Sequence, residues 1–383
     1  MPLKFVFGPS GSGKSTYLYQ HVIEESEKYP LKNFIVLVPE QFTMQTQKDL
    51  VSMHPRHGIM NIDVLSFARL AYRVFEETGT KQMQVLDDEG KNLILRKIAG
   101  DYEDKLTVLK GNIKKLGYIS EVKSVISEFT QYDIGEEEMD EMLDHLDEDS
   151  RLYYKLKDIR LLYEGFQDYL RERYITKEEL LDVLNSQVKE SELLKNSVVV
   201  LDGFTGFTPV QNRLILELMR CCREVWVTVT MDERENPYAY KHPYQLFGLS
   251  KQMVTTLVRM AGEDHIEVEE PVCLYGYPVK RFEKNQELAF LERNIFRYGA
   301  GRYDKAVENL EIHAAGNPRQ EADAVAEGIR RLVRKEQYRY RDIGVIVSDM
   351  DVYADHLKQA FIKYDIPFFM DHKRSILLNS FVE

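Results

Sequence analysis

Residues 8–15 read GPSGSGKS, a full match to the phosphate-binding loop pattern G-x-x-x-x-G-K-[ST]. The apolar run at 3–7 before the loop is typical of a buried strand, and residues 15–23 after it are typical of a helix start. A strand, a glycine-rich loop and a helix in this order bring backbone N–H groups and the positive end of the helix dipole to one point. The segment therefore predicts a nucleotide phosphate site.

The roles within this loop follow from the residue types. The glycines let backbone N–H groups turn toward phosphate oxygens. We expect Lys14 to reach the β- and γ-phosphates of ATP, and the Ser15 hydroxyl to hold Mg²⁺. The residues predicted to bind ATP are Gly8, Pro9, Ser10, Gly11, Ser12, Gly13, Lys14, Ser15 and Thr16.

The composition is that of an ordinary globular protein. The 383 residues are 44% apolar and 30% charged, which leaves room for two or three domains. No run of about 18 apolar residues occurs, so we expect no membrane contact. Three cysteines without metal-ligand spacing, and no secretory signal, favour a cytoplasmic protein. The net charge of −12 argues against a molecule-wide nucleic-acid surface but allows a local basic groove.

Strands and helices alternate at both ends of a long central segment. Apolar runs predict strands at 34–38, 62–65, 197–202 and 224–230, and alternation of this kind implies a parallel sheet. Thr208 and Pro209 predict the start of a helix that runs to about 222. From about 80 to 195 helical spacing replaces the strands, which predicts an all-helical insertion.

A second α/β region is predicted from about residue 308. Strands are expected at 310–313, 343–347 and 366–369, and helices at 321–334 and 353–364. Since this alternation stops without a finished sheet, we expect the chain to be a piece of a longer protein.

The order of these elements resembles superfamily 1 DNA helicases of the UvrD type. Within that group, four stretches resemble the AddB (RexB) family, the B subunits of bacterial AddAB helicase–nucleases. They are residues 38–43, 64–74, 201–209, and 340–347 followed by 366–369. The second and third look specific to AddB-like proteins, whereas the fourth is shared with UvrD-type helicases. The resemblance covers the whole chain but only the N-terminal third or so of such a protein.

The resemblance implies an α/β fold with a P-loop NTPase (RecA-like) parallel sheet. The first RecA-like domain would comprise 1–78 and 196–305, the helical insertion 79–195, and the start of a second, incomplete RecA-like domain 306–383. The implied partners are an AddA-like helicase–nuclease subunit, in a heterodimer, and single-stranded DNA. The family's nuclease domain and iron–sulfur cluster would lie beyond residue 383.

Several departures from a working helicase predict weak ATP hydrolysis or none. Asp202 ends its strand as the expected Mg²⁺ ligand, but Gly203 stands where the resemblance implies a catalytic glutamate. Loss of a water-positioning carboxylate should raise the barrier by about 3 kcal/mol or more. An adenine-reading glutamine is missing before the loop, and Ser348 stands where an ATP-contacting arginine is expected. Glu233 is interpreted as a structural residue or a remnant of a motif.

The resemblance also implies that the module holds single-stranded DNA and scans it for a short recombination hotspot (Chi). Such a groove needs basic side chains and stacking aromatic rings, and open α/β sheets bind ligands at the carboxyl ends of their strands. Core packing of the phenylalanines and ion pairing of the arginines are open alternatives. The candidate DNA-binding residues are Gln41, Phe42, Thr43, Ser66, Phe67, Arg69, Arg73, Phe204, Thr205 and Phe207.

Two other functions fit the phosphate loop. A stand-alone P-loop nucleotide kinase would use the helical insertion as a lid and turn over ATP with a small acceptor. A non-catalytic scaffold with a vestigial phosphate loop would bind neither ATP nor DNA on its own.

Overall fold

The computed structural model describes residues 2–79, 84–113, 115–171, 174–299, 301–371 and 381. The chain divides into two compact units, Met1–Gly301 and Arg302–Glu383. Each unit has hydrophobic cores of its own. In the described part of the chain, no helix is both long and apolar enough to cross a bilayer.

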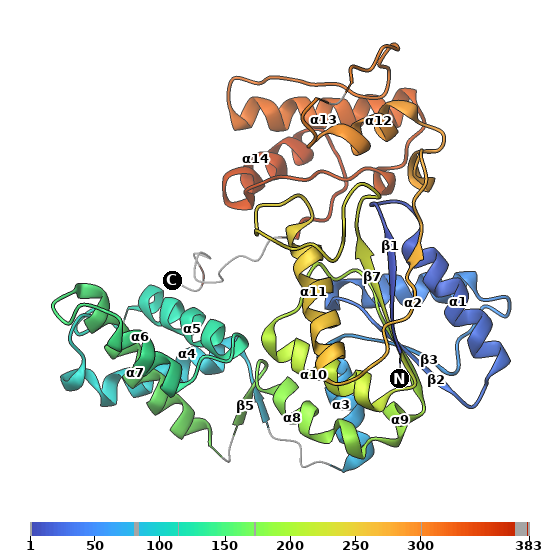
Figure 1. Ribbon diagram of the computed structural model, residues 1–383. Helices are drawn as coiled ribbons and strands as arrows, with labels where there is room; N and C mark the ends of the chain where they lie inside the picture. Colours follow the sequence, from blue (N-terminus) through green and yellow to red (C-terminus); the bar gives the residue numbers. More distant parts are fainter. Residues whose placement is uncertain are drawn as a thin grey trace. The chain divides into compact units, whose positions relative to one another are not determined.

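A six-stranded, all-parallel sheet forms the centre of the first unit (Figure 1). Its order is β3-β2-β6-β7-β1-β8. Strand β7 therefore lies between β1, which precedes the phosphate loop, and β6, which Asp202 follows. The α/β class is thereby confirmed, and the five strands predicted for this sheet, at 3–7, 34–38, 62–65, 197–202 and 224–230, match to within one residue. The strands are β1 Leu3–Gly8, β2 Asn33–Leu37, β3 Ile62–Leu65, β6 Ser197–Leu201, β7 Glu224–Thr230 and β8 Val272–Cys273.

Helices cover both faces of this sheet. Helices α1 (Lys14–Lys28) and α2 (Thr43–Met53) share a core with Val6, whereas Phe5 and Phe7 point into the core on the opposite face. Side chains alternate between faces along a strand, so a sheet covered on both sides needs continuous apolar strands. The helices of the second face are α3 Phe67–Thr78, α8 Leu180–Gln187, α9 Glu192–Lys195, α10 Pro209–Cys221 and α11 Gly248–Glu263.

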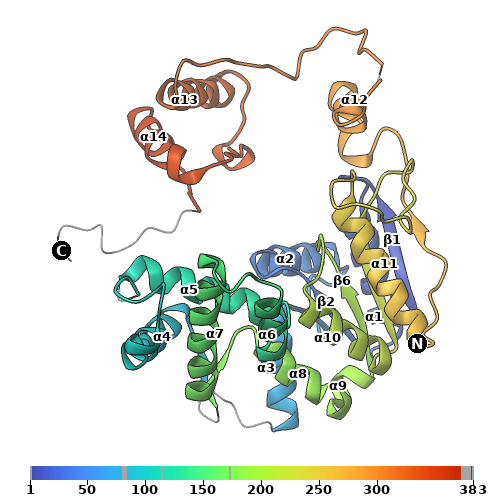
Figure 2. The same ribbon diagram turned by 60° about the vertical axis from the view of Figure 1, so that its left-hand side comes forward.

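The central segment builds a bundle with its own core, seen apart from the sheet in Figure 2. Its helices are α4 Asp88–Asp101, α5 Leu116–Gln131, α6 Glu136–Asp144 and α7 Arg151–Leu170. The prediction of an all-helical insertion is wrong at its base. There β4 (Gln84–Leu86) and β5 (Tyr174–Thr176) pair in parallel, because the chain enters and leaves the bundle side by side.

A buried ion pair joins this bundle to the segment that returns to the sheet. Lys91 of α4 is 2% exposed, and its ammonium donates to the Glu178 carboxylate at 2.6 Å and to the Ser127 hydroxyl at 3.2 Å. Glu178 lies just before α8, whose Leu184 belongs to the sheet's core. A buried charge is tolerated only when it is paired and hydrogen-bonded.

The second unit contains α13 (Pro318–Lys335) and α14 (Met350–Lys363), packed through Ala326 and Phe361. Tyr353 of α14 donates to Glu321 at 2.7 Å and so ties the two helices together.

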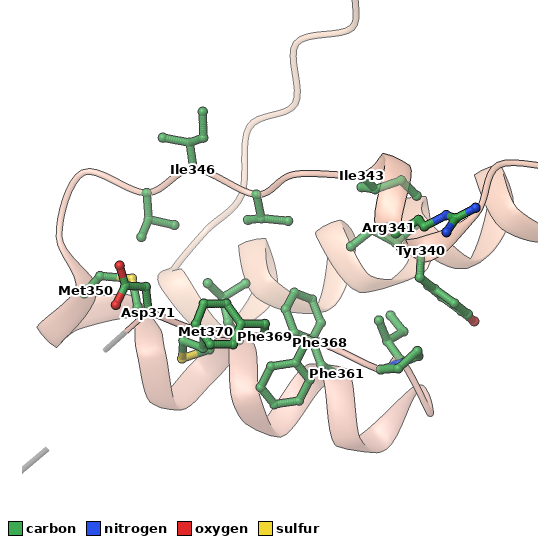
Figure 3. Close-up of a pocket in the computed structure, with 16 residues that line it drawn as sticks. Tyr340, Arg341, Ile343, Ile346, Met350, Phe361, Phe368, Phe369, Met370 and Asp371 are labelled. Carbon is green, nitrogen blue, oxygen red and sulfur yellow. The ribbon is translucent and has the colours of Figure 1, made fainter. Parts of the chain in front are cut away.

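The strands predicted at 310–313, 343–347 and 366–369 are not formed. Among residues 302–371 these segments pair with no neighbouring strand, and a strand exists only where its backbone groups pair laterally. The last two instead line an open apolar pocket of about 820 Å³, in which Phe361 and Phe368 lie side by side (Figure 3). Ile346 points away from these rings and is 96% exposed.

We expect Glu178→Ala to lower the free energy of unfolding by about 3–5 kcal/mol, because it leaves the buried ammonium of Lys91 without its carboxylate partner. Urea denaturation followed by circular dichroism measures the change. Glu263→Ala removes the partner of Arg259 in a pair whose side chains are 62% and 63% exposed, and it serves as the control without a resolvable effect. Equal midpoints for the two variants would contradict the role given to the buried pair.

Candidate nucleotide site

The phosphate loop spans the gap between β1 and α1. Gly11 and Gly13 have φ angles of +81° and +93°, in the left-handed region that favours glycine. Gly13 is the N-cap of α1 and carries no side-chain cap. The first N–H groups of this helix are therefore available to an anion.

Lys14 folds back onto the loop that carries it. Its ammonium donates to the carbonyl oxygens of Gly8 at 2.9 Å and Pro9 at 3.0 Å. Burial lowers the pKa of Lys14 to about 8, although the nearby Asp202 carboxylate acts in the opposite direction. The protein thus compensates the positive charge of Lys14 only in part. Bound phosphate oxygens would compensate the rest.

Asp202 is held by hydroxyl groups from two further elements. It follows β6 directly, is 5% exposed, and accepts hydrogen bonds from Ser15 at 3.1 Å and Tyr19 at 2.7 Å, both on α1. Thr228, on the neighbouring strand β7, donates to the same carboxylate at 2.6 Å. The two residues predicted to hold Mg²⁺, Ser15 and Asp202, therefore lie within hydrogen-bond distance of one another.

A cavity of about 460 Å³ opens above the loop. Asp202 is the one carboxylate among the described residues that line it. The lining residues are Ser10, Gly11, Gly13, Lys14, Ser15, Thr16, Asp202, Gly203, Phe204, Thr205, Thr228, Thr230, Lys280 and Arg281.

The chemistry of these residues fits the Mg²⁺–ATP that the sequence implies. The Ser12 hydroxyl oxygen is buried and has no hydrogen-bond partner in the described part of the chain, and such an atom usually has a ligand or water partner. The Ser15 hydroxyl and the Asp202 carboxylate are hard oxygen ligands of the kind that Mg²⁺ prefers.

Gly203, at the position where the resemblance implies a catalytic glutamate, has a backbone conformation that favours glycine. Gly203 has φ +79°, and its N–H donates to the Thr228 hydroxyl at 3.3 Å. A glutamate there would be strained. Glu233 does not replace it, because its carboxylate pairs with Arg293 at 2.8 Å.

The aromatic candidates for DNA binding pack on one another. Phe204 lies 5.4 Å from Phe67 and 5.2 Å from Phe207, measured between ring centroids. Phe67 is 7% exposed and belongs to the core, whereas Phe204 and Phe207 are half-buried. Phe42 is 49% exposed, in the short turn Glu40–Phe42 before α2.

The polar candidates lie at the carboxyl ends of β2, β3 and β6, which are neighbours in the sheet. Gln41 and Thr205 are exposed, whereas Thr43 is buried and donates its hydroxyl to the Glu40 carbonyl at 3.0 Å.

On the next helix, the Ser66 hydroxyl caps α3 by accepting the N–H of Arg69 at 3.4 Å. Arg69 and Arg73 are exposed on α3, and Arg73 lies 3.9 Å from Glu76.

Sequence reasoning missed four residues at this site. Tyr19 lies four positions after Ser15 and so on the same helix face, a spacing that was available as a signal. Thr228 is a hydroxyl in an otherwise apolar strand. Lys280 and Arg281 carried no local signal, because only the pairing of β8 with β1 brings their segment to the loop.

Comparison with known proteins covers the whole chain. The family described as "ADDB, N-terminal" matches residues 5–292. The chain belongs to the AddB family.

A relative from Lachnoclostridium phytofermentans, named as the B subunit of an ATP-dependent helicase/deoxyribonuclease, is 44% identical over 100% of this chain and 34% of its own length. Relatives of the same name from Clostridium kluyveri and Clostridium acetobutylicum are 35% and 31% identical over 100% of this chain and 33% of theirs. The chain spans about a third of these AddB relatives, and the resemblance stated from its sequence is confirmed.

We expect Tyr19→Phe to lower the free energy of unfolding by about 1–3 kcal/mol, because the buried Asp202 carboxylate loses a charge-assisted hydrogen bond. Tyr17→Phe is the matched control, since Tyr17 lies on the same helix, and we expect its effect to stay within about 0.5 kcal/mol. Urea titrations of both variants give the values, and a silent Tyr19→Phe would refute the role of this hydroxyl.

The depressed pKa of Lys14 predicts a pH dependence of stability. Its folded value of about 8 lies below the ordinary 10.5, so the unfolded chain binds more protons between these values. Stability contributed by this position should therefore rise as the pH increases through this range. The unfolding free energy of the unchanged chain minus that of Lys14→Met should increase from about pH 7.5 to about pH 10. A constant difference would show that Lys14 is not desolvated.

Proposed function

We propose that this chain is the ATP-binding, helicase-like region of the B subunit of a helicase–nuclease that processes double-strand DNA ends for recombinational repair. The observation that carries this proposal is the contact between Ser15 and Asp202 beneath a loop that also presents Lys14. The names of the AddB relatives support the DNA-processing part.

In this proposal the loop binds the phosphates of ATP through backbone N–H groups and the ammonium of Lys14. Ser15 and Asp202 would hold Mg²⁺, which neutralises phosphate charge when bound. Tyr19 and Thr228 orient the Asp202 carboxylate by donating to it.

Hydrolysis is proposed to be slow or absent. A water molecule that attacks the γ-phosphate must be positioned and deprotonated, usually by a second carboxylate. Asp202 is the one carboxylate among the described lining residues, and Gly203 leaves no side chain beside it. Binding and hydrolysis are thus separable here, and the nucleotide would have a structural or regulatory role.

We further propose that the carboxyl ends of β2, β3 and β6 hold single-stranded DNA, and that the strand is scanned there for a hotspot sequence such as Chi. The exposed ring of Phe42 and the exposed Arg69 supply the stacking and the charge that such binding needs. The unwinding partner would be an AddA-like subunit in a heterodimer.

Calorimetric titration of Mg²⁺–ATP into this chain and into Lys14→Ala tests the nucleotide site. We expect saturable binding that Lys14→Ala weakens by at least about tenfold, since it removes a charge-assisted contact to phosphate. Phosphate release should stay at background with and without single-stranded DNA.

Two kinds of outcome would contradict this proposal. Absence of binding by the unchanged chain would indicate a scaffold with a vestigial loop. Rapid hydrolysis that single-stranded DNA stimulates would indicate a motor, and rapid transfer to a nucleoside monophosphate would indicate a kinase.

A further inference from the structure

We propose that Lys280 and Arg281 are phosphate-binding residues, which together with Lys14 surround the polyphosphate tail of the nucleotide within the first unit. This inference rests on the proposed ATP binding and names the residues that complete it. Both side chains line the 460 Å³ cavity above the phosphate loop. Neither belongs to the phosphate loop motif nor to any element expected from the sequence.

The turn that carries these residues is fixed against the loop by backbone contacts. It spans Lys280–Phe282 and follows β8, which pairs with β1 through Phe7 and Cys273. The N–H of Arg281 donates to the carbonyl oxygen of Gly11 at 3.0 Å. Val279, just before the turn, is buried and anchors it.

Glycine is required where the turn and the loop meet. A Cβ added to Gly11 would lie 2.7 Å from the Cβ of Arg281, and one added to Gly13 would lie 3.2 Å from the Cδ of Lys280. The turn and the loop are therefore in direct contact, and the cationic side chains of Lys280 and Arg281 line the cavity above the loop.

Within the described part of the chain, no carboxylate forms an ion pair with Lys280 or Arg281. Neighbouring arginines differ sharply: Arg293 pairs with Glu233 at 2.8 Å, and Arg297 pairs with Glu235 at 2.8 Å. The lining of the cavity thus contains three cations and one carboxylate, Asp202, and the Glu292 carboxylate lies outside the lining but within electrostatic range of Lys14.

Such an excess of positive charge around a glycine loop matches a polyanion. A guanidinium can form two parallel hydrogen bonds with phosphate oxygens, and an ammonium acts as a point charge. Lys14, Lys280 and Arg281 place like charges on the wall of one cavity, where they repel one another. A bound phosphate chain would relieve this repulsion.

The position of these cations has a functional consequence. In a motor of the kind that the sequence resembles, an arginine of the second domain would contact phosphate, and the resemblance implies Ser348 at that position. Arg281 supplies a guanidinium from the same unit as the loop. Nucleotide held in this way does not need the second unit.

Calorimetry of Mg²⁺–ATP binding by Arg281→Ala and Lys280→Ala tests the inference. We expect each substitution to weaken binding by about tenfold or more at low salt, and Arg281→Lys to restore only part of the loss. Lys284→Ala is the matched control, because Lys284 is exposed just after the turn and does not line the cavity. Since the lost interaction is between charges near solvent, the ratio of affinities should shrink from about 50 mM to about 500 mM salt.

The results distinguish failure of this inference from failure of the proposed ATP site. If the unchanged chain does not bind ATP, or binds it only as well as Lys14→Ala does, the proposed function fails. If Lys14→Ala loses binding while Arg281→Ala and Lys280→Ala match Lys284→Ala, only the present inference is overturned. It is also overturned if Arg281→Ala weakens binding by a ratio that salt leaves unchanged, because that would indicate a change in loop shape.

Discussion

Parallel pairing of β6, β7 and β1 is the constraint on which the rest of the site depends. It brings the carboxyl end of β1, where the phosphate loop begins, to the same edge of the sheet as Asp202 and Thr228. This register places the Thr228 hydroxyl of β7 at 2.6 Å from the Asp202 carboxylate that follows β6. Because the hydroxyl donors come from α1 and β7, the Asp202 carboxylate after β6 is held in place by the protein's own side chains.

The sequence predicted the parts of this fold that have strong local signals. The strands predicted for the sheet are mainly apolar runs, and the start of α10 carries Thr208, whose hydroxyl accepts the N–H of Gln211 as a helix cap. The contact of Ser15 with Asp202 could be anticipated because both belong to recognisable patterns. The turn at Lys280 and Arg281 could not, since its place depends on β8, a two-residue strand whose apolar signal is too short to notice.

Errors in the prediction have the same physical origin. Apolar runs at 343–347 and 366–369 have strand composition, but a strand also needs a partner whose backbone groups face it. The described residues of the second unit provide none, so these runs line a pocket with exposed ring and aliphatic surface instead. Likewise, β4 and β5 were missed because each pairs only with the other across the helical bundle. Local composition predicts the capacity to form a strand, whereas pairing is a property of the whole chain.

Binding and hydrolysis of ATP place different demands on a P-loop domain, and in the proposed function this chain would meet only the first. Binding needs donors and cations around the phosphates, which the loop, Lys14 and the turn at Arg281 offer from one unit. Hydrolysis needs a positioned base. At the position where the resemblance implies that base, Gly203 has a left-handed backbone in which a residue with a side chain would be strained. A glutamate at position 203 would therefore meet backbone strain as well as altered chemistry. In the proposed function, the left-handed backbone at Gly203 therefore favours a nucleotide that is bound for stability or regulation over one that is hydrolysed.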